Sequence, residues 1–145
     1  MPLAILKRAL AVWLLIIVAE SIHGTLRTIF LEPALGSFRA RQLSVFTATI
    51  IIFTITWFTI RWMRGGPSGP SEPVGALAPS TCFAIGGLWV VLTLIFEFSL
   101  GLSLGMNWAR MLEDYDLSKG GLMLFGLAAM FATPWVANRY RKANV

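Results

Sequence analysis

The stretches Leu43–Met63 (LSVFTATIIIFTITWFTIRWM) and Phe83–Met106 (FAIGGLWVVLTLIFEFSLGLSLGM) decide the fold of this chain. Among Asp, Glu, Lys and Arg, the first stretch contains only Arg61 and the second contains only Glu97. A helix needs about 20 apolar residues to cross the hydrocarbon core of a bilayer. A lipid-exposed backbone must satisfy its hydrogen bonds internally, so we expect both stretches to be transmembrane helices.

Two further apolar stretches flank this pair, at about Ala9–Leu31 and about Gly121–Ala137. The composition agrees with a membrane protein, because 57% of the residues are hydrophobic and only 13% are charged. The sequence therefore predicts an all-α membrane protein with four transmembrane helices. No small-x-small cleavage site follows the first apolar run, so we expect a retained anchor and not a signal peptide. Pro33 is expected to end the first helix.

The segment Gly65–Ser80 contains four glycines and four prolines in sixteen residues, which predicts a flexible linker. It divides the chain into a first transmembrane hairpin at 1–64, the linker at 65–80, and a second hairpin at 81–145. Both termini and the linker are expected in the cytoplasm, because lysine and arginine favour that side. Seven of these residues lie on the predicted inner side and five on the outer side: Lys7, Arg8, Arg61, Arg64, Arg139, Arg141 and Lys142, against Arg27, Arg39, Arg41, Arg110 and Lys119.

The two hairpins share a pattern that suggests an internal repeat. Glu20 is followed four residues later by Gly24, and Glu97 is followed at the same spacing by Gly101. Each hairpin also ends in a Trp and an Arg at matching distances from its glutamate. We expect two tandem two-helix repeats that run in the same direction, with the glutamates at similar depth.

Glu20, His23 and Arg27 are spaced by three and four residues, so a helix presents them on one face. Charged side chains are costly in the middle of a bilayer, so Glu97 needs a partner, and Arg27 or His23 is the best candidate. The sequence predicts an intramembrane polar site formed by these four residues. It leaves open whether the site is a proton relay or binding site, or a cluster that fixes helix packing.

Three glycines, Gly24, Gly101 and Gly105, are expected to allow close helix packing. The outer segment carries Glu113, Asp114 and Asp116, whose spacing lacks the ligand pattern of a calcium loop. We interpret it as a solvated acidic loop, with Trp108 and Tyr115 anchored at the membrane interface. With one histidine and one cysteine, the sequence gives no reason to expect a metal or another cofactor.

The runs AESIHGTLR, FEFSLGLSLG and LEDYDLSKGG resemble small bacterial four-helix membrane proteins that are uncharacterised. This resemblance implies a bacterial inner membrane and no particular activity. The segment VAESIHGTL is also similar to the glutamate-bearing first helix of small multidrug resistance transporters. The long linker, the acidic outer loop and the second glutamate do not fit that family.

Two classes of function stay open. One is proton-linked binding or transport of a small solute, with Glu20 and Glu97 as protonatable groups. The other is a non-catalytic subunit or assembly factor of a larger membrane complex, or a homo-oligomer, in which the buried charges hold helices together. A lipid- or quinone-modifying enzyme is a third alternative. Nucleic acid is not an expected partner, because the basic residues lie at the ends of apolar runs facing the lipid headgroups.

Overall fold

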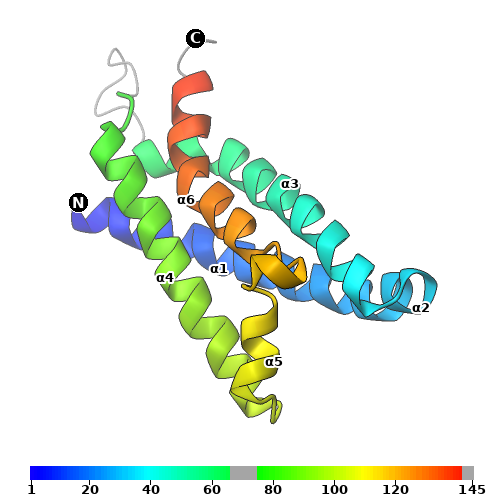
Figure 1. Ribbon diagram of the computed structural model, residues 1–145. Helices are drawn as coiled ribbons and strands as arrows, with labels where there is room; N and C mark the ends of the chain where they lie inside the picture. The colour runs from blue at the N-terminus through cyan, green and yellow to red at the C-terminus, as the bar shows by residue number, and fades with distance from the viewer. Residues whose placement is uncertain (66–74, 142–145) are drawn as a thin grey trace.

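The computed structural model describes residues 1–65 and 75–141, and this part of the chain is all helical, with no strand (Figure 1). The all-α fold class predicted from the sequence is therefore confirmed. In chain order the elements are α1 (Leu3–Leu26), the π-helical turn η1 (Arg27–Leu31), α2 (Glu32–Leu35), α3 (Ser37–Arg64), α4 (Pro79–Ser103), α5 (Trp108–Glu113), the 3₁₀ turn η2 (Leu117–Lys119) and α6 (Met123–Tyr140).

Two of the described helices, α3 and α4, are long and apolar enough to cross a membrane. Helix α3 contains the whole second predicted span and begins six residues before Leu43. Helix α4 contains the third predicted span except for its end, because α4 stops three residues before Met106. Helix α6 is 18 residues long and contains Pro134, Asn138 and Arg139. The first and fourth spans stay predictions.

The prediction that Pro33 ends the first helix is wrong. The helical path continues through η1 and α2, and Pro33 lies in the first turn of α2. Pro33 follows a π-helical turn, in which the Glu32 N–H bonds to the Arg27 carbonyl five residues earlier, so it lies where the regular α-helical pattern of hydrogen bonds is already interrupted. The chain turns instead at Gly36, whose φ of +78° is a left-handed conformation that favours glycine.

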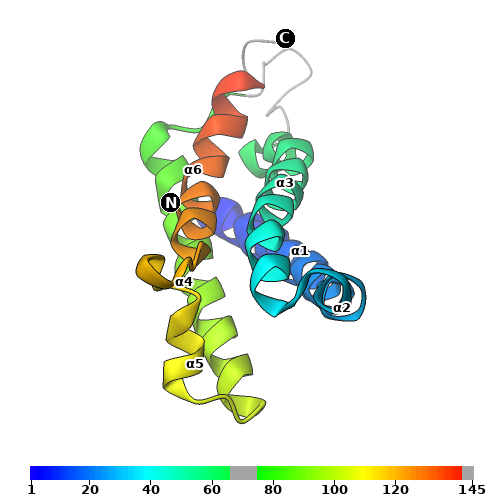
Figure 2. The same ribbon diagram turned by 45° about the vertical axis from the view of Figure 1, so that its right-hand side comes forward.

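The long helices pack in a definite order. Helix α6 packs against both α3 and α4, and α1 packs against α3. Helices α1 and α4 meet where they cross, because Trp13 Nε1 donates to Thr93 Oγ1 at 3.1 Å and Trp89 Nε1 donates to the carbonyl of Ala9 at 2.9 Å. Beyond this crossing the α2 turn and the α4–α5 turn point away from each other in both views (Figures 1 and 2).

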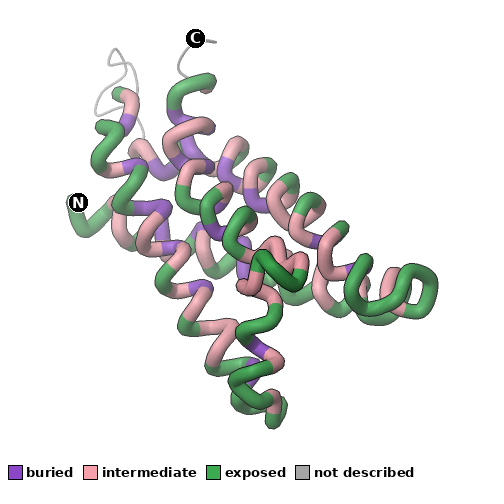
Figure 3. Tube along the Cα trace, in the orientation of Figure 1, coloured by how far each residue is buried: buried purple, intermediate pink, exposed green. Residues whose placement is uncertain are grey.

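The crossing separates two ends of the molecule. We call the end that holds the start of α1, the end of α3, the start of α4 and the end of α6 the closed end. The opposite end, with η1, α2, α5 and η2, is the open end. The fully buried side chains gather toward the closed end (Figure 3): Trp89, Ile16, Ile60, Met63, Ile85, Val12, Thr56, Pro134 and Cys82.

A polar network ties the closed end together. Asn138 Oδ1 accepts hydrogen bonds from Arg64 Nε at 2.9 Å and from the Leu77 N–H at 3.2 Å. Its Nδ2 donates to the Leu77 carbonyl at 3.0 Å, and Arg64 Nη2 donates to the Asn138 carbonyl at 2.7 Å. Asn138 is therefore buried with its side-chain groups satisfied, and it fixes the chain that leads into α4.

The predicted linker 65–80 lies partly outside the described residues, which exclude 66–74. Its last residues are ordered, because Leu77 is buried and α4 begins at Pro79 with the proline in its first turn. Threonines on α3 bond to the carbonyl one turn earlier, as in the contact from Thr54 Oγ1 to Ile50 O at 2.7 Å. Their hydroxyls are thus satisfied within the helix.

Candidate functional site

The open end holds a partly open cavity of about 880 Å³, lined by α1, η1, α3, α4, α6 and the outer segment 106–122. All four residues of the predicted polar site line it: Glu20, His23, Arg27 and Glu97. The remaining lining is largely apolar, and includes Ile17, Ile52, Phe96, Leu127 and Met130. The divergence of α1 and α4 beyond their crossing therefore leaves a mostly apolar space, into which each of the two helices brings one glutamate.

Glu20, His23 and Thr47 form a chain of contacts on one wall of the cavity. His23 Nδ1 lies 3.4 Å from Glu20 Oε2, and His23 Nε2 lies 2.7 Å from Thr47 Oγ1. Nδ1 and Oε2 attract each other only if one proton lies between them. With the imidazole neutral, that proton is carried either by His23 Nδ1 or by the Glu20 carboxyl group. The Glu20–His23 pair can therefore hold and exchange a proton.

Glu97 has a different partner from the one predicted. Tyr115 donates its hydroxyl to Glu97 Oε2 at 3.2 Å, and Phe98 stacks on the Tyr115 ring with centroids 5.8 Å apart. Burial raises the pKa of Tyr115 above its usual range, and the adjacent Glu97 raises it further, so the phenol stays a neutral donor. Tyr115, expected as an interface anchor, is part of the cavity wall.

Glu97 has no direct hydrogen bond or ion pair with Arg27 or His23, the partners expected for it, and its pairing with either of them through water stays a prediction. Arg27 begins the π-helical turn η1, and its Nε lies 3.4 Å from Glu32 Oε1. His23 is engaged with Glu20 and Thr47. Arg27 and His23 therefore contact partners on the first hairpin, and Glu97 takes its hydrogen bond from the outer segment that folds back over α4.

The predicted packing glycines have three separate roles. A Cβ at Gly24 would have no atom within 4 Å, so the prediction of close packing there is wrong. Gly101 does allow a close approach, but of the Met111 side chain from α5 and not of a second long helix. Gly105 has a φ of +74° and follows the end of α4. The close approach between long helices occurs at Gly86, where a Cβ would lie 2.8 Å from the carbonyl carbon of Phe131.

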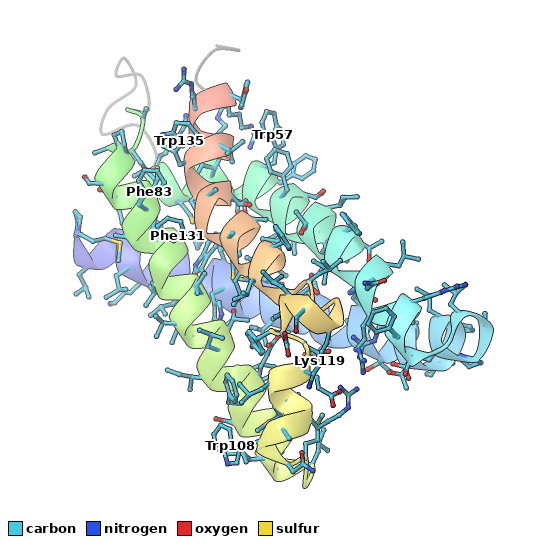
Figure 4. All side chains as sticks on the ribbon, in the orientation of Figure 1. Trp57, Phe83, Trp108, Lys119, Phe131 and Trp135 are labelled. Atoms are coloured by element: carbon cyan, nitrogen blue, oxygen red, sulfur yellow. The ribbon has the colours of Figure 1, made fainter. Side chains whose placement is uncertain are left out.

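The acidic residues of the outer segment have several partners, and Arg110 lies within ion-pair distance of both Glu113 and Asp114. Glu113 Oε2 pairs with Arg110 at 3.0 Å, and Asp114 Oδ1 pairs with Arg41 Nε at 3.2 Å. Asp116 Oδ1 accepts from the hydroxyl of Ser118 at 2.6 Å, which lowers the pKa of Asp116. Figure 4 labels Trp108 and Lys119, which belong to the first and last parts of this segment. The Arg41–Asp114 pair joins the outer segment to α3.

Three buried side-chain atoms in the described residues have no hydrogen-bond partner, namely Glu20 Oε1, Arg27 Nε and Ser44 Oγ. All three belong to residues that line the cavity. Buried polar groups are normally paired, so this concentration marks the cavity wall as the place where further partners would bind. The predicted polar site did not include Ser44, Thr47 or Tyr115, and the sequence offers no local signal for them except that Thr47 shares a helical face with Thr54 and Arg61.

The site combines a carboxyl–imidazole–hydroxyl chain with a second carboxyl held by a phenol. Such groups bind hydrogen-bonding solutes and transfer protons. Within the described residues, no group of three or more His, Cys, Asp or Glu side chains is arranged to hold a metal ion. Comparison with models of protein families, with curated proteins and with solved structures found no match to this chain.

Proposed function

We propose that this chain is a multi-pass protein of the bacterial inner membrane that binds or moves a small solute in a proton-linked manner. The observation that carries the proposal is the cavity of about 880 Å³, into which α1 and α4 each bring one glutamate. Neither Glu20 nor Glu97 has a Lys or Arg nitrogen within ion-pair distance among the described residues. Their charge is therefore balanced by protons or by a ligand.

The packing supports a membrane location with four spans. Helices α3 and α4 are each long enough to cross, and α1 and α6 lie against them. Helix α1 also exposes large apolar side chains, with Leu14, Leu15, Val18 and Ile22 at least half exposed. An exposed apolar face of this size suits contact with lipid. The basic closed end then faces the cytoplasm, with both termini.

The crossing of α1 and α4 supports the tandem repeat. Its two hydrogen bonds, Trp13 to Thr93 and Trp89 to Ala9, each join residues 80 apart in the sequence. Two contacts with the same offset mean that the helices run in the same direction where they meet. Parallel equivalent helices are what a duplicated two-helix hairpin produces.

Protons and solute are linked through the unpaired oxygen of Glu20. A ligand group that donates a hydrogen bond to Glu20 Oε1 favours the ionised carboxylate, and the proton shared with His23 is then released. Protonation of Glu20 weakens the same interaction and favours release of the ligand. Glu97 acts on the opposite wall in the same way, with Tyr115 as its fixed donor.

The test measures ligand binding and proton release together. Ethanolamine, acetate and acetamide represent a cation, an anion and a neutral amide. Each is added to the purified full chain in a weakly buffered detergent solution that contains a pH dye. We expect at least one probe to raise Tm and to release protons. Both responses should weaken by about tenfold or more in Glu20→Gln and Glu97→Gln, since a hydrogen bond to a charged group contributes about 1.5–3 kcal/mol.

The matched control is Arg39→Gln, because Arg39 is exposed and does not line the cavity. This variant should respond as the wild type does. Responses that are absent for every probe, or unchanged in both glutamine variants, would contradict solute binding at the cavity. The subunit alternative predicts no response to the probes and a stoichiometric companion after extraction in mild detergent.

A further inference from the structure

The two ends of the molecule differ sharply in charge. The described acidic residues all belong to the open end: Glu20, Glu32, Glu97, Glu113, Asp114 and Asp116. The seventh acid, Glu72, lies outside the described residues. The closed end carries Lys7, Arg8, Arg61, Arg64, Arg139 and Arg141, and none of these forms an ion pair within the described residues.

Several closed-end arginines already have protein partners. Arg64 donates to Asn138, and Arg141 donates to the carbonyl of Trp57 and lies over its ring. Arg8 lies over the ring of Trp62. Arg139 is exposed, and its guanidinium lies over the ring of Trp135, 5.4 Å from the centroid. Its N–H groups form no hydrogen bond or ion pair with the described residues, so they can bind an acceptor from outside the chain.

Arg139 ends a continuous row of rings on the α4–α6 surface, which we call the aromatic ladder. Its rings are Phe131, Phe83 and Trp135, with centroids 5.4 Å and 6.0 Å apart in that order (Figure 4). Phe131 and Phe83 are 41% and 38% exposed. Phe131, Trp135 and Arg139 are spaced by four residues on one face of α6, so the ladder follows about 12 Å of helix axis.

We propose that the aromatic ladder binds one anionic phospholipid. The phosphate lies at Arg139, whose planar guanidinium suits bidentate contact with phosphate oxygens. Trp135 lies at the level of the glycerol, where tryptophan is favoured at membrane interfaces. An acyl chain then follows Phe83 and Phe131 toward the bilayer centre. The proposal rests on the membrane location but not on solute binding at the cavity.

Two features make an anionic phospholipid the fitting occupant. The order of the ladder, from cation to indole to phenyl rings, matches the order of phosphate, glycerol and chain in a phospholipid. The closed end is rich in positive charge, and none of the described acidic residues belongs to it. An anionic headgroup is therefore favoured there over a zwitterionic one. An interface with a soluble protein has a rim of polar residues around its apolar centre, whereas contact with a lipid needs no such rim around the rings.

The first test uses the purified full chain in a neutral detergent. Phosphatidylglycerol should raise Tm, whereas phosphatidylcholine and inorganic phosphate should not. Arg139→Gln should raise the phosphatidylglycerol concentration for half the effect by about tenfold, the expected size for loss of one charge-assisted contact. The matched control is Arg110→Gln, an arginine of the open end that is partly exposed and should leave the lipid response unchanged.

A second readout places the lipid at the ladder. Phosphatidylglycerol with brominated chains should quench part of the tryptophan emission, and Trp135→Phe should remove that part while Trp108→Phe should not. The proposal is overturned if phosphatidylcholine or phosphate stabilises the chain equally. It is also overturned if Arg139→Gln and Arg110→Gln respond alike, or if quenching persists undiminished in Trp135→Phe.

Discussion

The closed and open ends of this molecule use polar residues in opposite ways. At the closed end, Asn138 is buried and its side chain exchanges hydrogen bonds with Arg64 and with both backbone groups of Leu77. At the open end, Glu20 Oε1 and Ser44 Oγ are buried without partners beside a large cavity. The difference indicates that the closed end supplies stability, while polar groups at the open end lack partners among the described residues, as the proposed solute binding requires.

The largest effect that separates the two ends is expected from glycine substitution. Gly86→Ala places a Cβ against the backbone of Phe131 on α6. Helix α6 can make room for this Cβ only by moving away from α4 and losing its packing there. Overpacking of this kind costs about 1–3 kcal/mol, and a backbone obstacle favours the upper part of that range. We expect Tm in detergent to fall markedly, as measured by differential scanning fluorimetry.

Gly24→Ala is the matched control at the open end. A Cβ there meets no atom within 4 Å, and alanine is favoured over glycine inside a helix by about 0.5–1 kcal/mol. The variant should be as stable as the wild type or slightly more stable. Equal losses in Gly86→Ala and Gly24→Ala would mean that the two ends are packed alike.

The next effect concerns the closed-end network. Asn138→Ala removes the partners of Arg64 Nε and of the buried Leu77 backbone, while Arg64 Nη2 keeps the Asn138 carbonyl, and an unpaired buried group costs about 1–3 kcal/mol. Asn107→Ala removes the N-cap of α5 at the open end, where Asn107 accepts from the Arg110 N–H, and a lost cap costs about 1 kcal/mol. Chemical denaturation should show the larger loss for Asn138→Ala, and the reverse order would contradict this assignment.

The fold class and the two helices long and apolar enough to cross a membrane could be predicted from the sequence, because long apolar runs have one stable arrangement in lipid. The polar set Glu20, His23, Arg27 and Glu97 could also be predicted, since ionisable residues stand out in such runs. The partner of Glu97 could not be predicted from the sequence. Tyr115 lies 18 residues away on an outer segment whose return over α4 has no local signal.

The turn and packing predictions failed for similar reasons. Pro33 is compatible with the start of a helix as well as with an end, and the π-helical turn before it determines which applies. The spacing of Gly101 and Gly105 resembles a helix-packing motif, yet the second glycine is needed for the positive φ that follows α4. The hydrogen bonds of Asn138 could not be predicted from the sequence, because its partner Leu77 is distant in sequence and part of an apparent linker.

A smaller effect is expected from the ion pair that joins the outer segment to α3. Arg41 and Asp114 are 3.2 Å apart, with side chains 21% and 42% exposed. A double-mutant cycle of Arg41→Gln and Asp114→Asn should give a coupling of about 0.2–1 kcal/mol, as for other solvent-accessible pairs. Additive effects would show that Gln42, which donates to the Gly120 carbonyl at 3.0 Å, holds the segment without help from the pair.

The most direct test of the contrast compares the reactivity of thiols at the two ends. Cys82, the single native cysteine, is fully buried at the closed end, whereas Gly24 lines the cavity with open space beside its Cα. The wild type and Gly24→Cys are treated in the folded state with iodoacetamide, and adducts are located by mass spectrometry. We predict no adduct on the wild type and one adduct, at position 24, on the variant. Modification of Cys82 at a comparable rate, or an unreactive thiol at position 24, would contradict the closed and open ends described above.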